Sequence, residues 1–449
     1  MKTKPSGARK SLTFLLAGGF MGLALGPAAH GADLMAVYRD ALAYDAQFAA
    51  AKATVDAGRE KLPQGRSGLL PTIGFGASTT WTDSEITARV TGATATNRDY
   101  NSNGWEVRLT QPLFRWQNWV AYNQSELAVA QAEAQFGLAR QDLIVRSAQA
   151  YFDVLLAQDV LATAQAQKVA IAEQLESAKR HFEVGTTTIT DTHEAQARYD
   201  LTSAQEIAAL NDLNVKRQVL RSVIGKEPEG LKNLKPGVQL AGPQPADIAK
   251  WVEMAESASA SVQIYQALYE IAVREIEKQR AGHYPTLDLV ATNGRSGAGG
   301  GSTGGFDSKS STVGLQLSIP IYAGGVTASR DREAVALKEK AAADLDNARR
   351  TAALNARQAY LGVSSGLAQV KAYEAALTSS QSALDSNKLG YEVGVRINID
   401  VLNAQSQLFD TRQKLAKARL DTLGALLKLK ASAGSLSEDD VAAINGLLD

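Results

Sequence analysis

The 449-residue sequence contains no cysteine, which excludes disulfide bonds, thiol chemistry and a lipid anchor on an N-terminal cysteine. Its 47 basic and 47 acidic residues balance, so neither nucleic acid nor an acidic lipid surface is indicated as a partner. Beyond the N-terminal segment, no stretch approaches the roughly 18 continuous apolar residues of a membrane-spanning helix. If the mature chain enters a bilayer, it must therefore do so with β-strands.

The first 31 residues have the pattern of a secretory signal peptide. A basic head is followed by the apolar segment 12–25 and by the small residues Ala29 and Gly31 at the expected cleavage positions. We therefore expect residues 1–31 to be removed and the mature chain to start at Ala32. A retained membrane anchor is the alternative, but the apolar run is too short to span a bilayer comfortably.

Proline is absent from two long segments, between Pro112 and Pro228 and after Pro320. Both segments are rich in alanine, glutamine, leucine, glutamate, arginine and lysine, which favour helices. They predict two pairs of long helices, at about 116–182 and 187–224 and at about 326–389 and 397–432. Apolar stripes along these helices suggest coiled packing between neighbours.

The second half of the mature chain resembles the first at an offset of 209 residues. Four anchors share this register: Gln149-Ala150-Tyr151 with Gln358-Ala359-Tyr360, Glu183-Val184-Gly185 with Glu392-Val393-Gly394, Ile189-Thr190-Asp191 with Asn398-Ile399-Asp400, and Ala195-Gln196 with Ala404-Gln405. We therefore predict two structural repeats, 32–240 and 241–449, each with two strands and two long helices.

Four short segments switch to alternating apolar and polar residues, the pattern of β-strands with one apolar face. They predict strands at about 71–82, 104–114, 285–293 and 311–322. The alternation fits both a transmembrane barrel and an ordinary sheet on a soluble core. Trp81, Trp105 and Trp116 lie near the expected strand ends, and tryptophan at such places is typical of a membrane–water interface, which favours the barrel.

Four strands cannot close a barrel, and unpaired strand edges are not tolerated in lipid. Known membrane barrels begin at about eight strands, so at least two copies of the chain are needed, and three copies would provide twelve strands. If the predicted strands span a membrane, the chain must therefore assemble with copies of itself.

The turns between the long helices resemble those of the TolC family of bacterial outer-membrane ducts. The resemblance rests on the segments 181–191 and 390–402, and on three strand ends that contain proline: Leu69-Leu70-Pro71, Tyr284-Pro285-Thr286-Leu287 and Ile319-Pro320-Ile321-Tyr322. It extends over nearly the whole mature chain, from Leu34 to the acidic C-terminal segment.

This resemblance implies a mixed α and β membrane protein. The expected assembly is a homotrimer, in which a twelve-stranded transmembrane β-barrel continues into a long periplasmic α-helical barrel. Segments 225–250 and 433–449 would form a small equatorial domain. The resemblance also implies a location in the outer membrane of a Gram-negative bacterium.

The function implied by the resemblance is that of the exit duct of tripartite efflux or type I secretion systems, with passive export of small molecules or proteins. The implied partners are further copies of the chain, outer-membrane lipid, a periplasmic adaptor (a membrane fusion protein) and an inner-membrane pump of the ABC, RND or MFS type. No cofactor and no nucleic acid are expected.

The resemblance also implies a periplasmic gate, in which the two hairpins of one copy are linked. Thr190 and Asp191 on the outer hairpin would face Tyr391 and Arg396 on the inner one, with Asp191 accepting hydrogen bonds from both. Charge-assisted bonds of this kind are stronger than neutral ones. Spacing alone favours solvated residues near turns, so this prediction depends on the resemblance.

Asp400 is the candidate for a pore constriction. Three copies around a symmetry axis would bring three carboxylates together, raise their pKa values as a coupled set and bind cations. The chain has Asn403 where the family carries a second aspartate, so we expect a weaker negative throat.

The turns themselves, Val184-Gly185-Thr186 and Val393-Gly394-Val395, have two compatible interpretations. Glycine is the usual residue where a helix ends with positive φ. The resemblance adds that these tips dock the periplasmic adaptor.

Enzymatic function is not indicated. The formal dinucleotide motif Gly299-x-Gly301-x-x-Gly304 leads into a strand rather than a helix, and the histidines lack the spacing of metal ligands. The alternative to an outer-membrane duct is a soluble periplasmic structural or adaptor protein made of coiled helical hairpins.

Overall fold

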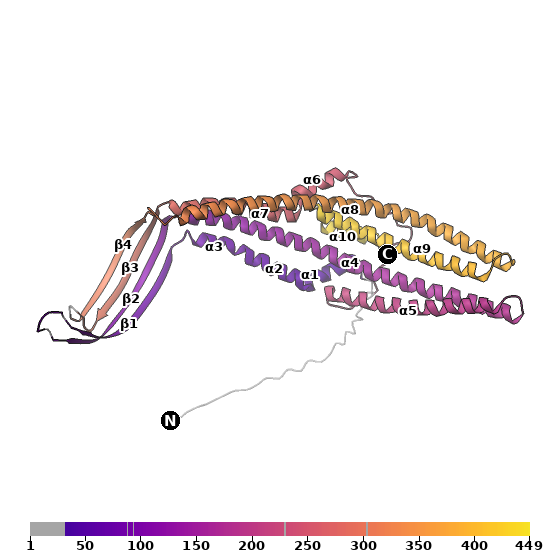
Figure 1. Cartoon of the computed structure of the whole chain (residues 1–449), viewed down its shortest axis with the longest axis horizontal. Helices are drawn as coiled ribbons and strands as arrows, with labels where there is room; N and C mark the ends of the chain where they lie inside the picture. Colours follow the sequence, from indigo (N-terminus) through magenta and orange to yellow (C-terminus); the bar gives the residue numbers. More distant parts are fainter. Residues whose placement is uncertain (1–31, 88, 93, 229, 302–303) are drawn as a thin grey trace, which may run out of the picture.

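The computed structural model describes residues 32–87, 89–92, 94–228, 230–301 and 304–449. The expected signal peptide, 1–31, lies outside the described residues. Figure 1 shows an elongated chain with a four-stranded sheet at one end and two helical hairpins at the other, while α1, α6 and α10 lie near mid-length. The sheet and the hairpin tips are therefore far apart.

Two pairs of long helices form the hairpins. The outer hairpin consists of α4 (Trp116–Glu183) and α5 (Ile189–Ile224), and the inner hairpin consists of α8 (Val326–Glu392) and α9 (Asn398–Ser432). The shorter elements are α1 (Leu34–Tyr44), α2 (Ala46–Arg59), α3 (Lys61–Ser67), α6 (Ile248–Ala258), α7 (Ala260–Arg280), η1 (Ala281–His283) and α10 (Glu438–Asn445). Within the described ranges, no helix is long and apolar enough to cross a membrane.

The sheet is antiparallel, in the order β1 (Thr72–Ile86), β2 (Thr96–Phe114), β3 (Thr286–Ala298) and β4 (Phe306–Ser318). The strands extend farther toward the β1–β2 and β3–β4 turns than the alternation predicts. The expected strand at 104–114 begins at Thr96, because asparagine, serine and threonine continue the ladder after the apolar alternation has ended. At the opposite end β4 stops at Ser318 rather than 322, since Pro320 has no N–H to donate to a ladder.

The register gives the sheet two chemically different faces. Ile73 lies opposite Leu109, which lies opposite Ala291, which lies opposite Val313. Directly paired residues project to the same side, so this face collects Ile73, Phe75, Ala77, Trp105, Val107, Leu109, Leu287, Leu289, Ala291, Val313, Leu315 and Leu317. The other face carries glycine, serine, threonine and charged residues. The apolar side chains of β1 and β4 are exposed, with Phe75 at 70% and Val313 at 77%.

The sequence placed Trp81, Trp105 and Trp116 near strand ends, and this prediction is wrong for Trp81 and Trp105. Trp81 pairs with Asn101 and Trp105 pairs with Ala77, both inside their strands. They mark instead the place where the apolar band gives way to polar residues such as Asn103. Trp116 is the first residue of α4, and its indole N–H donates to Glu277 at 3.0 Å.

One ion pair connects the sheet to the helices. Arg115, between β2 and α4, donates from Nε and Nη2 to the two carboxylate oxygens of Asp288 on β3, at 2.8 and 2.6 Å. The Asp288 side chain is only 8% exposed. Such a bidentate pair fixes direction as well as distance, and it therefore sets the angle at which α4 leaves the sheet.

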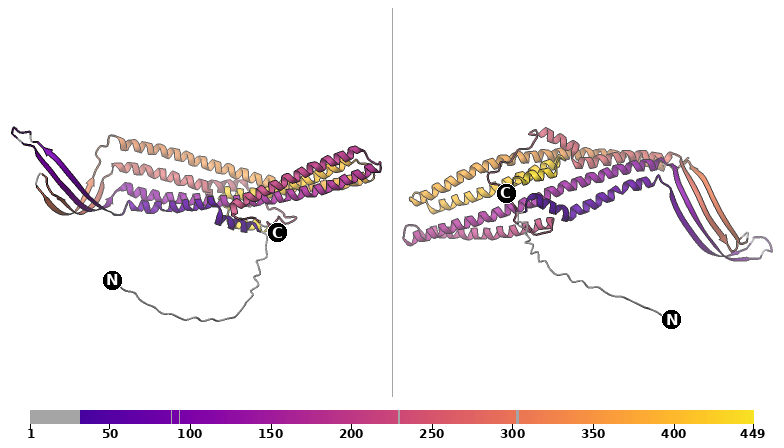
Figure 2. Two further views of the ribbon diagram at one scale, coloured as in Figure 1. Left: turned by 90° about the horizontal axis from the view of Figure 1, so that it is seen from below. Right: turned by 180° about the vertical axis from the view of Figure 1, so that it is seen from behind.

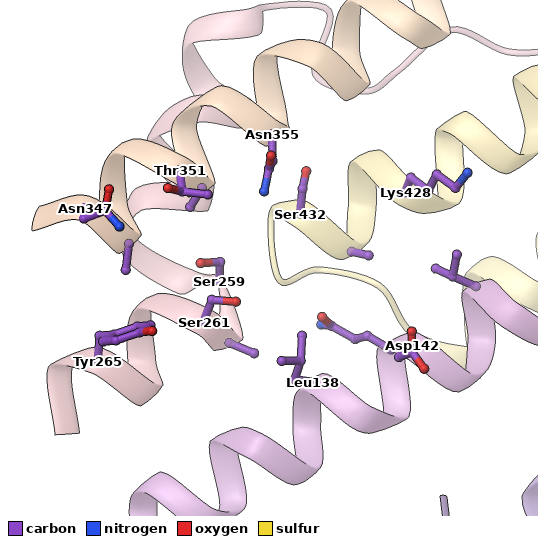
Figure 3. A pocket seen from close by; sticks show the side chains of 16 residues that line it. Leu138, Asp142, Ser259, Ser261, Tyr265, Asn347, Thr351, Asn355, Lys428 and Ser432 are labelled. Atoms are coloured by element: carbon purple, nitrogen blue, oxygen red, sulfur yellow. The ribbon is translucent and has the colours of Figure 1, made fainter. Parts of the chain in front are cut away.

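The turn after α9 meets the junction between α6 and α7, and both α7 and α9 pack against α4 and α8. Figure 2 shows the chain from two further sides. The approach is close: a Cβ at Gly434, whose φ is +72°, would lie 2.3 Å from the Ala258 carbonyl oxygen. The junction leaves a pocket of about 470 Å³, into which side chains of α4, α7, α8 and α9 project, including Leu138, Ser261, Asn355 and Ser432 (Figure 3).

The repeated Gln-Ala-Tyr motif holds the chain segments at mid-length. The Tyr151 hydroxyl donates to the Lys232 carbonyl at 2.7 Å, and the Tyr360 hydroxyl donates to the Ala246 carbonyl at 2.6 Å. Tyr151 on α4 and Tyr360 on α8 thus each hold one point of the segment between α5 and α6, which connects the two halves of the chain.

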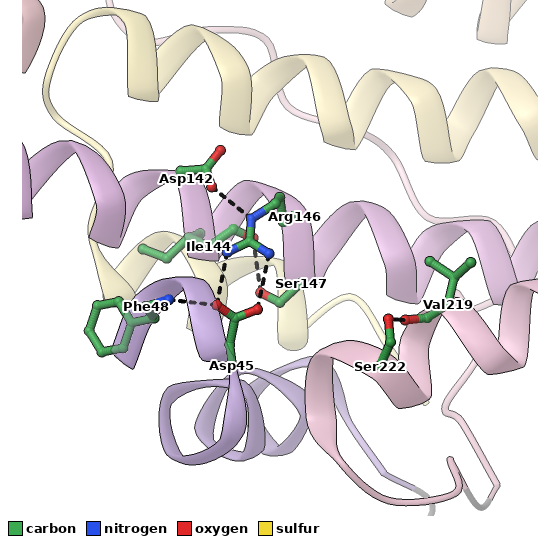
Figure 4. Close-up of polar contacts among 8 residues, drawn as sticks. All are labelled: Asp45, Phe48, Asp142, Ile144, Arg146, Ser147, Val219 and Ser222. Atoms are coloured by element: carbon green, nitrogen blue, oxygen red, sulfur yellow. Dashed lines mark hydrogen bonds and ion pairs between the residues drawn. The ribbon is translucent and has the colours of Figure 1, made fainter. Parts of the chain in front are cut away.

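A second anchor at mid-length is the carboxylate of Asp45, which lies between α1 and α2. It accepts from Arg146 on α4 at 3.0 and 3.1 Å and from the Phe48 N–H at 2.7 Å (Figure 4). Burial alone would raise the pKa of Asp45, but the bonds from Arg146 and from the backbone outweigh it and lower this pKa below the ordinary value. The ionised carboxylate therefore stabilises the fold.

We predict that Asp45→Ala lowers the free energy of unfolding by about 2–3 kcal/mol, because it removes a buried ion pair and a helix cap together. Thermal unfolding of the detergent-solubilised protein, followed by circular dichroism, measures the loss. The contribution is present at neutral pH and is lost as pH falls through the lowered folded-state pKa, so the two proteins should converge in strong acid. Asp142→Ala removes the exposed partner of the same arginine and should cost less than about 1 kcal/mol; an equal loss in both variants would contradict this account.

Candidate functional site at the helical tips

The two hairpins end in turns with the same backbone geometry. In the outer turn, the N–H groups of Val184, Gly185 and Thr186 donate to Arg180, Phe182 and His181, at 3.2, 2.9 and 2.8 Å. In the inner turn, those of Val393, Gly394 and Val395 donate to Leu389, Tyr391 and Gly390, at 3.1, 3.1 and 2.8 Å. The glycines have φ of +74° and +78°, which other residues rarely adopt.

Three of the four residues that flank these glycines are valines with exposed side chains, and the fourth is Thr186. Val184, Val393 and Val395 are 73%, 64% and 75% exposed. An apolar side chain gains nothing from this position in the single chain. The predicted docking residues therefore lie at the surface, at the end of the molecule farthest from the sheet.

The predicted hydrogen bonds of Asp191 are wrong for the single chain. Its carboxylate accepts from the N–H and hydroxyl of Thr188, at 3.2 and 3.3 Å, and forms the capping box of α5. The spacing Thr-x-x-Asp at a helix start favours this local arrangement. Thr190, in the same first turn, is exposed.

Tyr391 nevertheless lies close to Asp191. Its ring contacts that of His181 edge to face, with centroids 6.0 Å apart, and within the described residues its hydroxyl has no hydrogen-bond partner. Burial, and secondarily the Asp191 carboxylate, raises the pKa of Tyr391 above its usual value. The inner and outer hairpins thus meet at Tyr391, but without the predicted bond.

Arg396 and Asp400 approach each other within the inner hairpin rather than across it. The Arg396 guanidinium lies 3.7 Å from the Asp400 carboxylate, and its side chain is 59% exposed. Asn403 is exposed and accepts a hydrogen bond from Arg198 on α5 at 2.9 Å. Asn403 was expected only to reduce the negative charge at the constriction, but its side chain also connects α9 to α5.

Between the hairpins lies a cavity of about 770 Å³, lined by His181, Asp191, Tyr391, Arg396, Asn398 and neighbouring residues. Three of the four predicted gate residues, Asp191, Tyr391 and Arg396, thus line the same cavity. Sequence reasoning missed Asn398, which crosses between the hairpins. A signal for it was present, since the repeat places isoleucine at the equivalent position, Ile189.

The model of the outer membrane efflux protein family matches residues 37–226 and 251–435. This chain belongs to the outer membrane efflux protein family. It is 33% identical over 427 residues to outer membrane protein TolC of Escherichia coli, covering 93% of this chain and 85% of that protein. It is also 33% identical over 438 residues to the alkaline protease secretion protein AprF of Pseudomonas aeruginosa, covering 96% and 90%.

Solved structures of outer-membrane channels have the same fold. VceC of Vibrio cholerae superimposes with a TM-score of 0.76 at 19% identity, over 89% of this chain and 96% of that one. CmeC of Campylobacter jejuni gives 0.76 at 18% identity, over 93% and 90%. Membership of this family places the protein in the outer membrane of a Gram-negative bacterium.

Proposed function

We propose that three copies of this chain form one continuous duct. The observation that carries this proposal is a two-faced sheet whose edge strands, β1 and β4, have no partner strand in the described part of the chain. In lipid such edges must be paired. Pairing β4 of one copy with β1 of the next would close twelve strands, with the apolar face toward lipid and the polar face toward the lumen.

As an outer membrane efflux protein, the chain serves as an exit duct for efflux and type I secretion. The relatives are channels and secretion proteins rather than enzymes. A soluble periplasmic adaptor is not favoured, because soluble proteins rarely expose an apolar sheet face of this extent to water.

In the proposed assembly the helices continue the duct into the periplasm, and each half of the chain contributes one structural repeat. Segments 225–250 and 433–449 form an equatorial belt, supported by their position near mid-length and by the Tyr151 and Tyr360 anchors. Trp81, Trp105 and Trp116 lie near the membrane interfaces.

The exposed tips, Val184-Gly185-Thr186 and Val393-Gly394-Val395, dock a periplasmic adaptor that connects the duct to an inner-membrane pump. Burial of their valine side chains on docking would remove apolar surface from water and so favour the complex.

The gate of the proposed duct comprises Thr190, Asp191, Tyr391 and Arg396. Because the Arg396 side chain is largely exposed, it is free to reach a carboxylate of a neighbouring copy in addition to Asp400. Asp400 forms the constriction, where three carboxylates meet around the axis.

Replacing Arg396 with Ser should shift the closed-to-open ratio by about tenfold, because it removes hydrogen bonds to charged groups that hold the hairpins inward. Single-channel conductance in planar bilayers should rise severalfold. Arg350→Ser serves as the matched control, because it removes an arginine of α8 that pairs with Asp346 one turn away and lies outside the cavity at the tips. An unchanged conductance in Arg396→Ser would remove this residue from the gate.

Replacing Asp400 with Ala should relieve block by trivalent cations added on the tip side, with the blocking affinity reduced about tenfold or more. Asn403→Asp should strengthen the block, because it adds a second carboxylate from each copy. Asp410→Ala, which removes an exposed carboxylate paired with Lys414 on the same helix, should leave it unchanged. Persistent block in Asp400→Ala would locate the cation site elsewhere.

A further inference from the structure

Asn398 is a buried polar residue at the tip of the inner hairpin. It is the first residue of α9 and is 1% exposed. The equivalent residue of the outer hairpin, Ile189, is the first residue of α5 and is 45% exposed. This is the reverse of what polarity would favour, because the apolar side chain of Ile189 faces water while the amide of Asn398 is buried. Apolar packing alone does not account for an amide at such a position.

The amide of Asn398 contacts both helices of the outer hairpin. Its Oδ1 accepts from Nε2 of Gln174 on α4 at 2.5 Å. Its Nδ2 donates to the backbone carbonyl of Asp191 in the first turn of α5 at 3.2 Å. A single side chain therefore connects α9 with α4 and α5.

An apolar contact between the hairpins accompanies these bonds. Leu402, one turn along α9, is fully buried against Ile171, Leu175 and Ala178 of α4 and Ala195 of α5. Apolar packing gives attraction but little direction. The two hydrogen bonds of Asn398 supply the direction, and they fix where the inner hairpin stops against the outer one.

We propose that Asn398 is the positioning residue that holds the inner hairpin against the outer hairpin of the same copy in the closed duct, with Gln174 as its partner. This inference rests on the proposed function of the tips as a gate. It adds a link that lies inside the wall of one copy and is independent of Arg396 and Asp400.

The geometry makes the link reversible. When the inner hairpin moves away, water reaches the amides of Asn398 and Gln174 and replaces the bonds they lose, so the link itself costs only the net value of two neutral hydrogen bonds to break. Exposure of Leu402 adds an apolar cost to opening. Removal of one partner has the opposite consequence. Gln174→Ala leaves the buried Oδ1 of Asn398 without its donor in the closed state only, and Asn398→Ala removes both bonds between the hairpins, so each substitution favours the open state.

The test compares Asn398→Ala, Gln174→Ala and the double variant of the full-length duct in planar bilayers. Each single variant should shift the closed-to-open ratio by about tenfold and raise the mean conductance. The double variant should add little to Asn398→Ala, because both substitutions remove the same link. The matched control is Asn387→Ala, which removes an amide that, among the residues the structure describes, donates to the Ala383 carbonyl of its own helix, and it should leave conductance unchanged.

Unchanged conductance in both single variants, with a raised conductance in Arg396→Ser, would overturn the role of Asn398 and leave the proposed duct intact. A wild-type chain that forms no channel would overturn both. If Asn398→Ala does not assemble, Gln174→Ala decides the matter alone, because Gln174 is partly exposed on a long helix and its truncation preserves the packing around Leu402.

Discussion

The edge strands of a β-sheet carry unpaired backbone N–H and C=O groups, and the sheet of this chain has two such edges, β1 and β4. In water these groups would bind solvent, but the apolar face beside them requires a non-aqueous environment. Both demands are met together only when other copies pair the edges. In the proposed duct, the need for assembly thus follows from backbone chemistry, while the choice of lipid as the surroundings follows from side chains such as Phe75 and Val313.

The helical part of the molecule depends on this closure. Arg115 and Asp288 fix the direction in which α4 leaves the sheet, so a closed ring of strands would impose a closed ring of helices. The hairpins extend from that ring without a further covalent constraint at their tips. In the proposed duct, weak and local contacts at the tips, such as those of Asn398 and Tyr391, would then be sufficient to set whether the far end is open.

The elements that the sequence predicts well are those specified by local chemistry. Proline-free segments predict the long helices, and the glycines of the two turns predict where α4 and α8 end. The alternation predicts which strand residues share a face. It does not predict the full length of β2, because the pairing of polar residues such as Asn101 and Asn103 has no periodic signature.

The site was predictable only in part. The resemblance correctly placed Asp191, Tyr391 and Arg396 near one another, and all three line one cavity. It also predicted that Asp191 accepts hydrogen bonds from Tyr391 and Arg396, whereas Asp191 accepts from the nearer Thr188. The link from Arg198 to Asn403, and that from Gln174 to Asn398, join residues more than 200 positions apart. No pattern along the chain specifies such pairs, although the mismatch between Ile189 and Asn398 marks the position where one of them lies.

The absence of cysteine makes the central claim, closure of the sheet by three copies, directly measurable. In the single chain, β1 and β4 lie at opposite edges, so a disulfide between them must join two copies. Ser78→Cys on the polar face of β1 would be combined in turn with cysteine at Ser308, Ser310, Thr312, Gly314 or Gln316 on that face of β4, and the outer membranes would be oxidised before denaturing electrophoresis. The account predicts that at least one pair gives covalent dimers and trimers and nothing larger. Monomers from every pair, or a ladder that continues beyond three chains, would contradict it.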